Sequence, residues 1–166
     1  MLIIPNYVSN TLHIYGDTDV LNRIREELAS EDRCIDFDKV IPMPPHSDTF
    51  FADGDISIEV QEQYGDNNWY DWSIANWGTK WNSLDSHIEG YADDGILTYV
   101  FDTAWTTPAP VAQAISSKYS VAVDLLYMGE EYGYNCGILE FDTQGNQIRS
   151  EHYDTDGEDF IERYFG

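Results

Sequence analysis

Residues 7–15 (YVSNTLHIY) alternate between two sets of side chains with a period of two, which is typical of a β-strand. Gly16 follows this pattern at once and ends the strand. Asp17 or Thr18 can then cap a helix, because apolar residues recur at helical spacing from this point to about Ala29. The chain is therefore predicted to begin with a strand followed by a helix.

The residues that follow this helix have weaker patterns. Residues 37–45 (FDKVIPMPP) predict a short extended piece closed by prolines, and residues 48–55 predict a loop. Residues 56–64 (ISIEVQEQY) are compatible with either a strand or a helix, and both alternatives stay open. In a helix, one face would carry three nearby carboxylates, those of Glu59, Glu62 and Asp66.

Tryptophan is concentrated in residues 69–81 (WYDWSIANWGTKW), where the spacing predicts a short helix that ends near Trp77. Gly78 is a suitable terminator, since glycine readily adopts the left-handed conformation that ends many helices. We expect this helix to lie across a sheet and to bury its rings in the core. The tryptophans expected in that cluster are Trp69, Trp72, Trp77 and Trp105.

A hairpin is predicted from residues 84–91 and 96–102, which flank Asp93, Asp94 and Gly95. The Asp-Gly pair between two apolar runs is a strong signal for such a turn. The second run is apolar on both faces, so we expect a central strand that is covered on both sides.

The C-terminal third of the chain adds a helix, three strands and a last helix. In order, these are a helix opened by Pro108 and Pro110, strands at 121–128, 133–141 and 147–153, and a helix capped by Asp154 or Thr155. The order predicts an α+β fold with a ferredoxin-like βαββαβ core and a mainly antiparallel sheet. We predict a single domain over residues 1–166, with a Trp-rich helical insert at about 45–82 and extra C-terminal strands and helix.

The charge balance is extreme, with 31 acidic residues against eight basic ones and a net charge of −23. Residues 48–102 hold twelve acids and one base, and residues 121–166 hold eleven acids and two bases. Such a field repels nucleic acid and attracts basic surfaces. We therefore expect no direct binding of DNA or RNA, and we expect a protein partner with a basic surface.

The two cysteines and the N-terminal residues indicate the cellular compartment of the protein. Cys34 and Cys136 are far apart, which fits two thiols in a reducing cytoplasm. The N-terminus lacks the basic segment of a signal peptide, and no apolar run approaches the ~20 residues that span a bilayer. These features predict a cytoplasmic protein without a membrane partner.

None of the motifs that carry chemistry is complete. Residues 154–159 resemble the start of a calcium loop, but Asp159 stands where the loop needs glycine, and helix capping is the preferred interpretation. The four histidines and two cysteines lack zinc-ligand spacing. No GxSxG or phosphate-binding loop occurs. We predict no catalytic residue, no metal, no cofactor and no enzymatic activity.

Four stretches together resemble a known family. They are PNYVSNTLHIYG (5–16), FDKVIPMP (37–44), WYDWSIANWGTKWN (69–82) and YVFDTAWTTP (99–108). The chain resembles the YubB-type ferredoxin-like domain family of bacterial plasmids and phages over about residues 5–142. This resemblance implies a ferredoxin-like fold and a mobile-element source, in a bacterial host. It implies no catalytic residue.

The first functional hypothesis combines the charge with that source. It is a phage- or plasmid-borne inhibitor of a nucleic-acid-targeting defence protein, such as an anti-CRISPR or anti-restriction protein. Carboxylates on a rigid surface would imitate a phosphate backbone and occupy the partner's basic groove. The candidate partner-binding residues are Asp53, Asp55, Glu59, Glu62, Asp66, Asp93, Asp94, Glu130 and Glu131.

The alternative is a non-enzymatic interaction module in which the charge serves only solubility. It would hold a partner through an aromatic surface or a sheet edge, and homodimerisation stays open. Exposed tyrosines such as Tyr132 and Tyr134 would then matter more than the acids.

Overall fold

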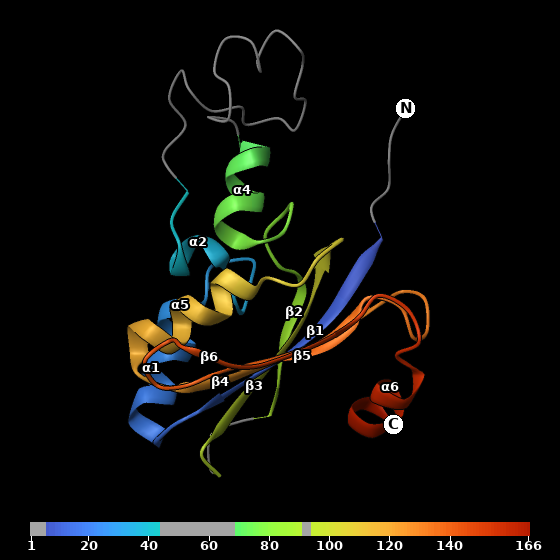
Figure 1. The fold of residues 1–166 in the computed structure, drawn as a ribbon. Helices are drawn as coiled ribbons and strands as arrows, with labels where there is room; N and C mark the ends of the chain where they lie inside the picture. Colours follow the sequence, from blue (N-terminus) through green and yellow to red (C-terminus); the bar gives the residue numbers. More distant parts are fainter. Residues whose placement is uncertain (1–5, 44–68, 91–93) are drawn as a thin grey trace, which may run out of the picture.

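The structure is a computed structural model of the 166-residue chain, and it describes residues 6–43, 69–90 and 94–166. Figure 1 shows its elements. In chain order they are β1 (Tyr7–Tyr15), α1 (Thr18–Leu28), α2 (Phe37–Val40), α4 (Trp69–Trp77), β2 (Leu84–Gly90), β3 (Ile96–Ala104), α5 (Ala109–Tyr119), β4 (Ala122–Gly129), β5 (Cys136–Phe141), β6 (Gln147–Tyr153) and α6 (Glu158–Phe165).

The described strands form one antiparallel sheet in the order β2-β3-β1-β4-β5-β6. The first four positions have the strand order of the ferredoxin-like core, and β5 and β6 extend it. The α+β class, the βαββαβ core and the extra C-terminal strands and helix are therefore confirmed. The sequence predicted mainly antiparallel pairing, and the five strand pairs within the described residues are all antiparallel.

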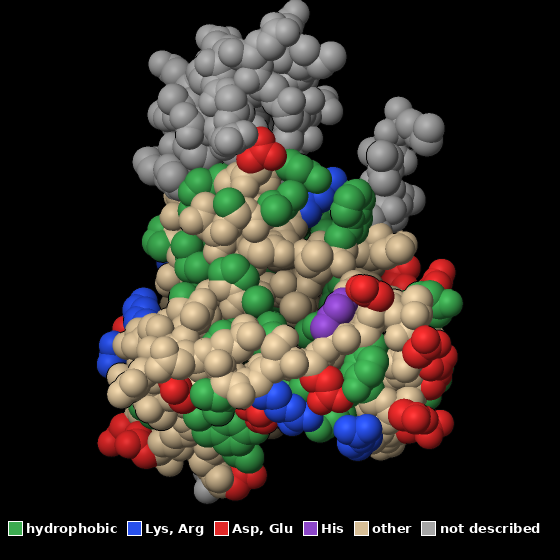
Figure 2. Space-filling model, viewed as in Figure 1, with side chains coloured by type: hydrophobic (Ala, Val, Ile, Leu, Met, Phe, Trp, Pro, Cys, Tyr) green, Lys and Arg blue, Asp and Glu red, His purple; other side chains and the backbone are tan. Residues whose placement is uncertain are grey.

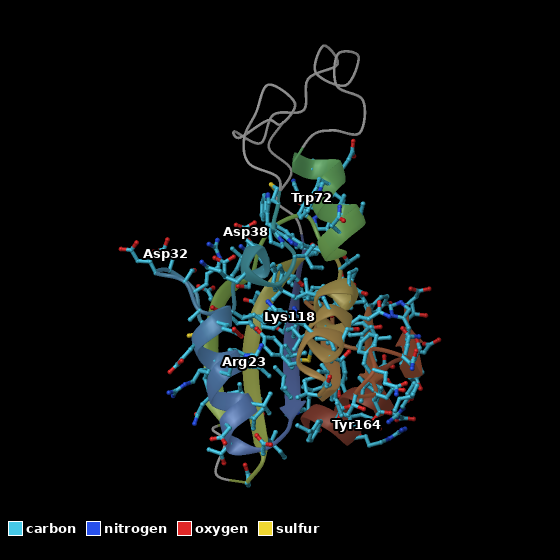
Figure 3. The ribbon with its side chains drawn as sticks, turned by 90° about the vertical axis from the view of Figure 1, so that its left-hand side faces the viewer. Arg23, Asp32, Asp38, Trp72, Lys118 and Tyr164 are labelled. Carbon is cyan, nitrogen blue, oxygen red and sulfur yellow. The ribbon has the colours of Figure 1, made fainter. Side chains whose placement is uncertain are left out.

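Helices α1, α2 and α5 cover one face of the sheet (Figure 1). The alternation of residues 7–15 explains this face, because every second residue of β1 from Val8 to Ile14 is buried. Leu12 lies opposite Tyr99 of β3 and Leu125 of β4, and all three are almost completely buried. In Figure 3, Arg23 and Lys118 lie on the neighbouring helices α1 and α5, and both charged groups lie over the Tyr119 ring.

The second face is covered only in part. Phe160 and Ile161 of α6 pack against Leu126, Cys136 and Ile138 from β4 and β5. The half of this face formed by β1, β2 and β3 has no such cover among the described elements. Among the described elements, residues 96–102 are therefore covered on one face only, because α6 packs over β4 and β5 instead.

The first helix begins as the sequence predicts. Asp17 is its cap, and the carboxylate accepts a hydrogen bond from the Val20 backbone N–H at 2.9 Å. The extended piece predicted at 37–45 is wrong in its first half. Asp36 caps α2 there, since its carboxylate accepts from the Asp38 N–H at 2.9 Å and so makes a helical turn stable before the prolines.

Helix α4 ends where it was predicted to end. Gly78 follows it with a φ of +77°, a conformation that side chains with a Cβ rarely adopt. A Cβ at this position would also approach Pro110 Cδ to 2.6 Å, so the glycine allows the helix end to lie against α5.

The predicted cap of the last helix is wrong. Gly157, and neither Asp154 nor Thr155, precedes α6, and no side chain caps it. The Gly157 N–H instead donates to the Gly133 carbonyl at 2.9 Å, which ties the helix start to the turn before β5. That turn occupies the first residues of the strand predicted at 133–141, so β5 begins at Cys136.

Candidate functional site

The predicted partner-binding residues divide into two groups. Three of them lie in the described part of the chain. Asp94 lies near the C-terminal end of β1, whereas Glu130 and Glu131 lie near its N-terminal end. Since β1 has nine residues, its ends are about 27 Å apart at ~3.4 Å per residue. The other predicted partner-binding residues lie outside the described residues; they are Asp53, Asp55, Glu59, Glu62, Asp66 and Asp93. The loop predicted at 48–55 and the segment 56–64 also lie outside them.

Glu130 and Glu131 lie on the turn between β4 and β5, at the start of β1. They line a cavity of about 220 Å³ together with Tyr134 and Asp154. The Glu130 carboxylate accepts a hydrogen bond from the Tyr7 backbone N–H at 3.0 Å. One of the two predicted acids therefore also anchors the first strand.

The turn itself is shaped by glycine and by its contact with α6. Gly133 has a φ of +86°, and a Cβ there would lie 2.8 Å from Glu158 Cδ. The turn consequently packs closely on the first turn of α6. This packing leaves Tyr132 and Tyr134 exposed, with 57% and 46% of their surface accessible.

Acidic side chains of α6 continue this surface (Figure 2). Partial desolvation by neighbouring side chains, and then the negative charges of Glu162, Glu158 and Asp159, raise the pKa of Tyr132. We call this region the acidic end surface. Its members are Glu130, Glu131, Tyr132, Tyr134, Asp154, Glu158, Asp159 and Glu162.

The two nearby arginines do not neutralise the acidic end surface. Arg149 lies 2.7 Å from Glu151 and 3.6 Å from Glu140, and it also donates to the Tyr164 hydroxyl. Arg163 lies 4.0 Å from Glu151. Among the described residues, no lysine or arginine forms an ion pair with an acid of the acidic end surface, where Asp154 pairs with His152 at 2.7 Å.

The tryptophan segment confirms only part of the expected cluster. Trp77 is buried and packs edge-on against Phe37 and Trp72. Trp105 is 44% exposed, and the expectation that it joins them is wrong. Its φ of +71° breaks the strand alternation, which turns the ring away from the core.

Trp105 instead belongs to a group of rings around a lysine. Lys80 Nζ lies 4.7 Å from the ring centre of Trp81, 5.6 Å from Tyr70 and 5.9 Å from Trp105. Cation–π attraction of this kind contributes about 0.5–1 kcal/mol at exposed sites. The aromatic rings therefore surround a cation that the protein itself supplies.

A buried polar network holds the segment that carries Trp105. The Asn10 amide donates to Thr103 Oγ1 at 2.9 Å and accepts from Thr107 Oγ1 at 2.7 Å. Thr103 Oγ1 in turn donates to the Thr106 carbonyl at 2.7 Å. Much of the 99–108 motif is thus explained by hydrogen bonds that fix this loop after β3.

Asp94 lines a different cavity from that of Glu130 and Glu131. The cavity lies on the uncovered half of the sheet, beside His13 and Tyr15 at the far end of β1. Neither His13 nor Tyr15 was predicted from the sequence to be a site residue. The alternation of residues 7–15 could have indicated that both side chains face away from the core, because they belong to the same set of alternate residues.

Within residues 6–43, 69–90 and 94–166, no three His, Cys, Asp or Glu side chains gather as metal ligands. None of the helices described in these ranges combines the length and the apolar character that crossing a membrane requires.

Comparison with known proteins identifies the family. Residues 76–163, from the end of α4 into α6, match the family described as the ferredoxin-like domain in Api92-like protein. The chain belongs to this Api92-like family. No curated protein matches the chain.

A solved structure related to this Api92-like chain has the same fold. It is the crystal structure of a protein api92 from Yersinia pseudotuberculosis, with 11% sequence identity and a TM-score of 0.60. The similarity covers 90% of this chain and 98% of that chain. At this identity, the comparison supports the ferredoxin-like fold of the Api92-like chain.

Proposed function

We propose that this protein binds a basic, nucleic-acid-binding protein through its acidic end surface and inhibits it by occupying the groove meant for nucleic acid. The observation that carries the proposal is a set of carboxylates at one end of the fold without Lys or Arg partners among the described residues. Inhibition would follow from occupancy alone, so no catalytic step is needed.

Physical chemistry favours a basic groove as the partner surface. Nucleic-acid-binding proteins contact phosphates mainly through arginine and lysine. Carboxylates can take the place of phosphates in such contacts, and complementary charge speeds association. Glu131, Asp159 and Glu162 are all exposed and available to such a surface.

The biological setting of the proposal comes from the sequence resemblance. A YubB-type domain implies a plasmid or phage source, and the partner would then be a host defence protein such as a CRISPR effector or a restriction enzyme. The protein would act in the cytoplasm of the bacterial host, where such proteins meet foreign DNA. Its own charge of −23 argues against direct binding of nucleic acid.

A second candidate function is an interaction module that relies on aromatic contacts. The observation in its favour is the exposure of Tyr132 and Tyr134, which lie within the acidic end surface. Tyrosine is enriched at binding surfaces because its ring adds contact area and its hydroxyl adds hydrogen bonds. Both candidate functions therefore use the same end of the molecule, and mutations can separate them.

The test is capture of partners from bacterial lysate with the tagged protein over a series of salt concentrations. The charge variant is Glu131→Lys with Asp159→Lys, which spares Glu130 because that residue anchors β1. The matched control is Asp19→Lys with Glu26→Lys on α1, which changes the net charge equally at exposed positions. The aromatic variant is Tyr132→Ala with Tyr134→Ala.

We expect the wild-type protein to capture a basic nucleic-acid-binding protein at low salt and to lose it at high salt. The charge variant should fail to capture this partner, while the control variant should still capture it. Loss only with the aromatic variant, in a complex insensitive to salt, would favour the second candidate. Equal loss with the charge variant and the control would reject the acidic end surface as the binding site.

A further inference from the structure

A second cavity lies on the uncovered half of the sheet, away from the acidic end surface. It has a volume of about 400 Å³, a size found in small-ligand sites. Strands β1 and β3 and the flanks of the β2–β3 connection supply its walls. The residues that line it are His13, Tyr15, Gly90, Asp94, Ile96 and Thr98.

Hydrogen bonds hold the two rings of this cavity in place. His13 Nδ1 lies 2.8 Å from Thr98 Oγ1, and the Tyr15 hydroxyl donates to Asp124 Oδ2 at 2.7 Å. The ring centres of His13 and Tyr15 are 6.4 Å apart. The Tyr15 hydroxyl proton is already donated to Asp124, so Tyr15 contributes its aromatic ring, rather than this proton, to the lining of the cavity.

The cavity is also negatively charged. Asp94 lines it, and Asp124 and Glu89 lie close enough to His13 to act on it electrostatically. Burial has the larger effect and lowers the pKa of His13, which favours the uncharged imidazole. None of the described residues that line the cavity is a lysine or an arginine. A cation that entered would therefore meet carboxylates and no competing positive charge.

We infer that this cavity binds a guanidinium group, stacked on the ring of Tyr15 and hydrogen-bonded to Asp94. A guanidinium is planar, stacks on aromatic rings and sheds its hydration more easily than an ammonium group. Its several N–H groups also match the carboxylate oxygens of Asp94 and the hydroxyl oxygen of Thr98, two residues that line the cavity.

The guanidinium has two possible sources. It can belong to a free small molecule, or to an arginine side chain of a protein partner. The second source rests on the proposed function, because the same basic partner would then contact both ends of β1. The first source does not depend on it.

The inference is tested by NMR titration with N-acetyl-arginine amide, using N-acetyl-lysine amide as the matched singly charged probe. We expect saturable shifts in the His13 and Thr98 signals, and binding of the arginine probe about fivefold tighter than that of the lysine probe. Tyr15→Leu should abolish this preference, whereas Tyr15→Phe keeps the ring and should retain it.

Charge specificity needs its own control in so acidic a protein. Asp94→Asn should weaken the arginine probe about threefold or more, while Asp19→Asn, with the same change of net charge on α1, should have no effect. Equal affinity for both probes, equal weakening by the two Asn variants, or shifts spread over the whole surface would overturn the inference. Thermal unfolding of each variant confirms that it is folded.

Partner capture then separates the two sources and the two claims. Loss of the captured partner with Tyr15→Leu assigns the guanidinium to a partner arginine. Unchanged capture, with the probe still bound to the wild type, assigns it to a free compound. If the acidic end surface variant captures normally and the arginine probe still binds, the proposed function fails and the guanidinium site stands.

Discussion

The backbone N–H of Tyr7 donates a hydrogen bond to Glu130 Oε1 at 3.0 Å, across 123 positions of sequence. The contact joins the first residue of β1 to the turn after β4. It gives the two adjacent acids of that turn different roles. Glu130 anchors a strand, whereas the carboxylate of Glu131 has no hydrogen bond or ion pair within the described structure.

Glu130→Ala should lower the free energy of unfolding by about 1 kcal/mol, because the Tyr7 N–H loses its acceptor. Glu131→Ala removes the same charge from the same turn and should leave stability almost unchanged. Urea denaturation of both variants measures the difference. Equal stability of the two would show that the Tyr7 contact contributes nothing.

Tyr99→Phe should stabilise the protein by about 1 kcal/mol. The Tyr99 hydroxyl is buried in the core and has no hydrogen-bond partner among the described residues, so its removal relieves a desolvated polar group. Tyr127→Phe is the matched control, since the Tyr127 hydroxyl lies 2.7 Å from His152 Nδ1 and its loss should destabilise. The measurement is the melting temperature, and a lower value for Tyr99→Phe would contradict the prediction.

Asp102→Asn should stabilise the protein at neutral pH and not in acid. Burial, and then repulsion from Asp85 and Glu130, raise the pKa of Asp102 above its ordinary value of 3.8. The folded state therefore binds its proton more tightly than the unfolded state does. The contribution of Asp102 to stability therefore falls as the pH rises from the pKa of the unfolded state to the higher pKa of the folded state. Above the folded-state pKa the contribution stays low.

The check is a pair of stability-against-pH curves. The Asp102→Asn variant should exceed the wild type at pH 7, and the two should converge below a pH of about 3.8, where both side chains are uncharged. Glu26→Gln on α1 controls for the loss of one charge from so acidic a protein. A gain of the same size from that variant would assign the effect to net charge.

Phe160→Ala should destabilise the protein by about 3–5 kcal/mol. The ring is 1% exposed and packs on Tyr153, Tyr164 and Phe165 in the cluster that covers β4 and β5. Loss of this contact should also expose apolar surface, which binding of a hydrophobic dye would detect. Phe165→Ala, at a half-buried position, should cost less, and the reverse order would contradict this account of how α6 docks.

Local patterns predicted most of the elements correctly. The period-two alternation of residues 7–15 depends only on neighbouring side chains, so β1 has the predicted bounds. The helix ending at Gly78 likewise follows from one residue's backbone freedom. The error at α2 has a local reason, because Asp36 caps a helical turn before the prolines. The error at α6 does not, because the Gly157 N–H donates to the carbonyl of Gly133, on a turn that precedes β5.

The candidate sites depended on contacts that no local pattern contains. Glu130 and Tyr7, Lys80 and Trp105, and His13 and Thr98 are brought together by strand pairing and loop packing across long stretches of chain. The sequence could therefore indicate carboxylates and aromatic rings, but not which of them share a surface.

The sequence by itself determined the net charge of −23, the α+β element order and the ferredoxin-like core, because composition and periodicity are properties of the chain alone. Only the tertiary structure decided where the charge acts. Sheet register separates Asp94 from Glu130 and Glu131 by the length of β1, and α6 covers only half of one face, so that no described element covers the other half. Pairing and packing join residues that are distant in sequence, and these long-range contacts place the predicted acidic residues that are described in two separate cavities.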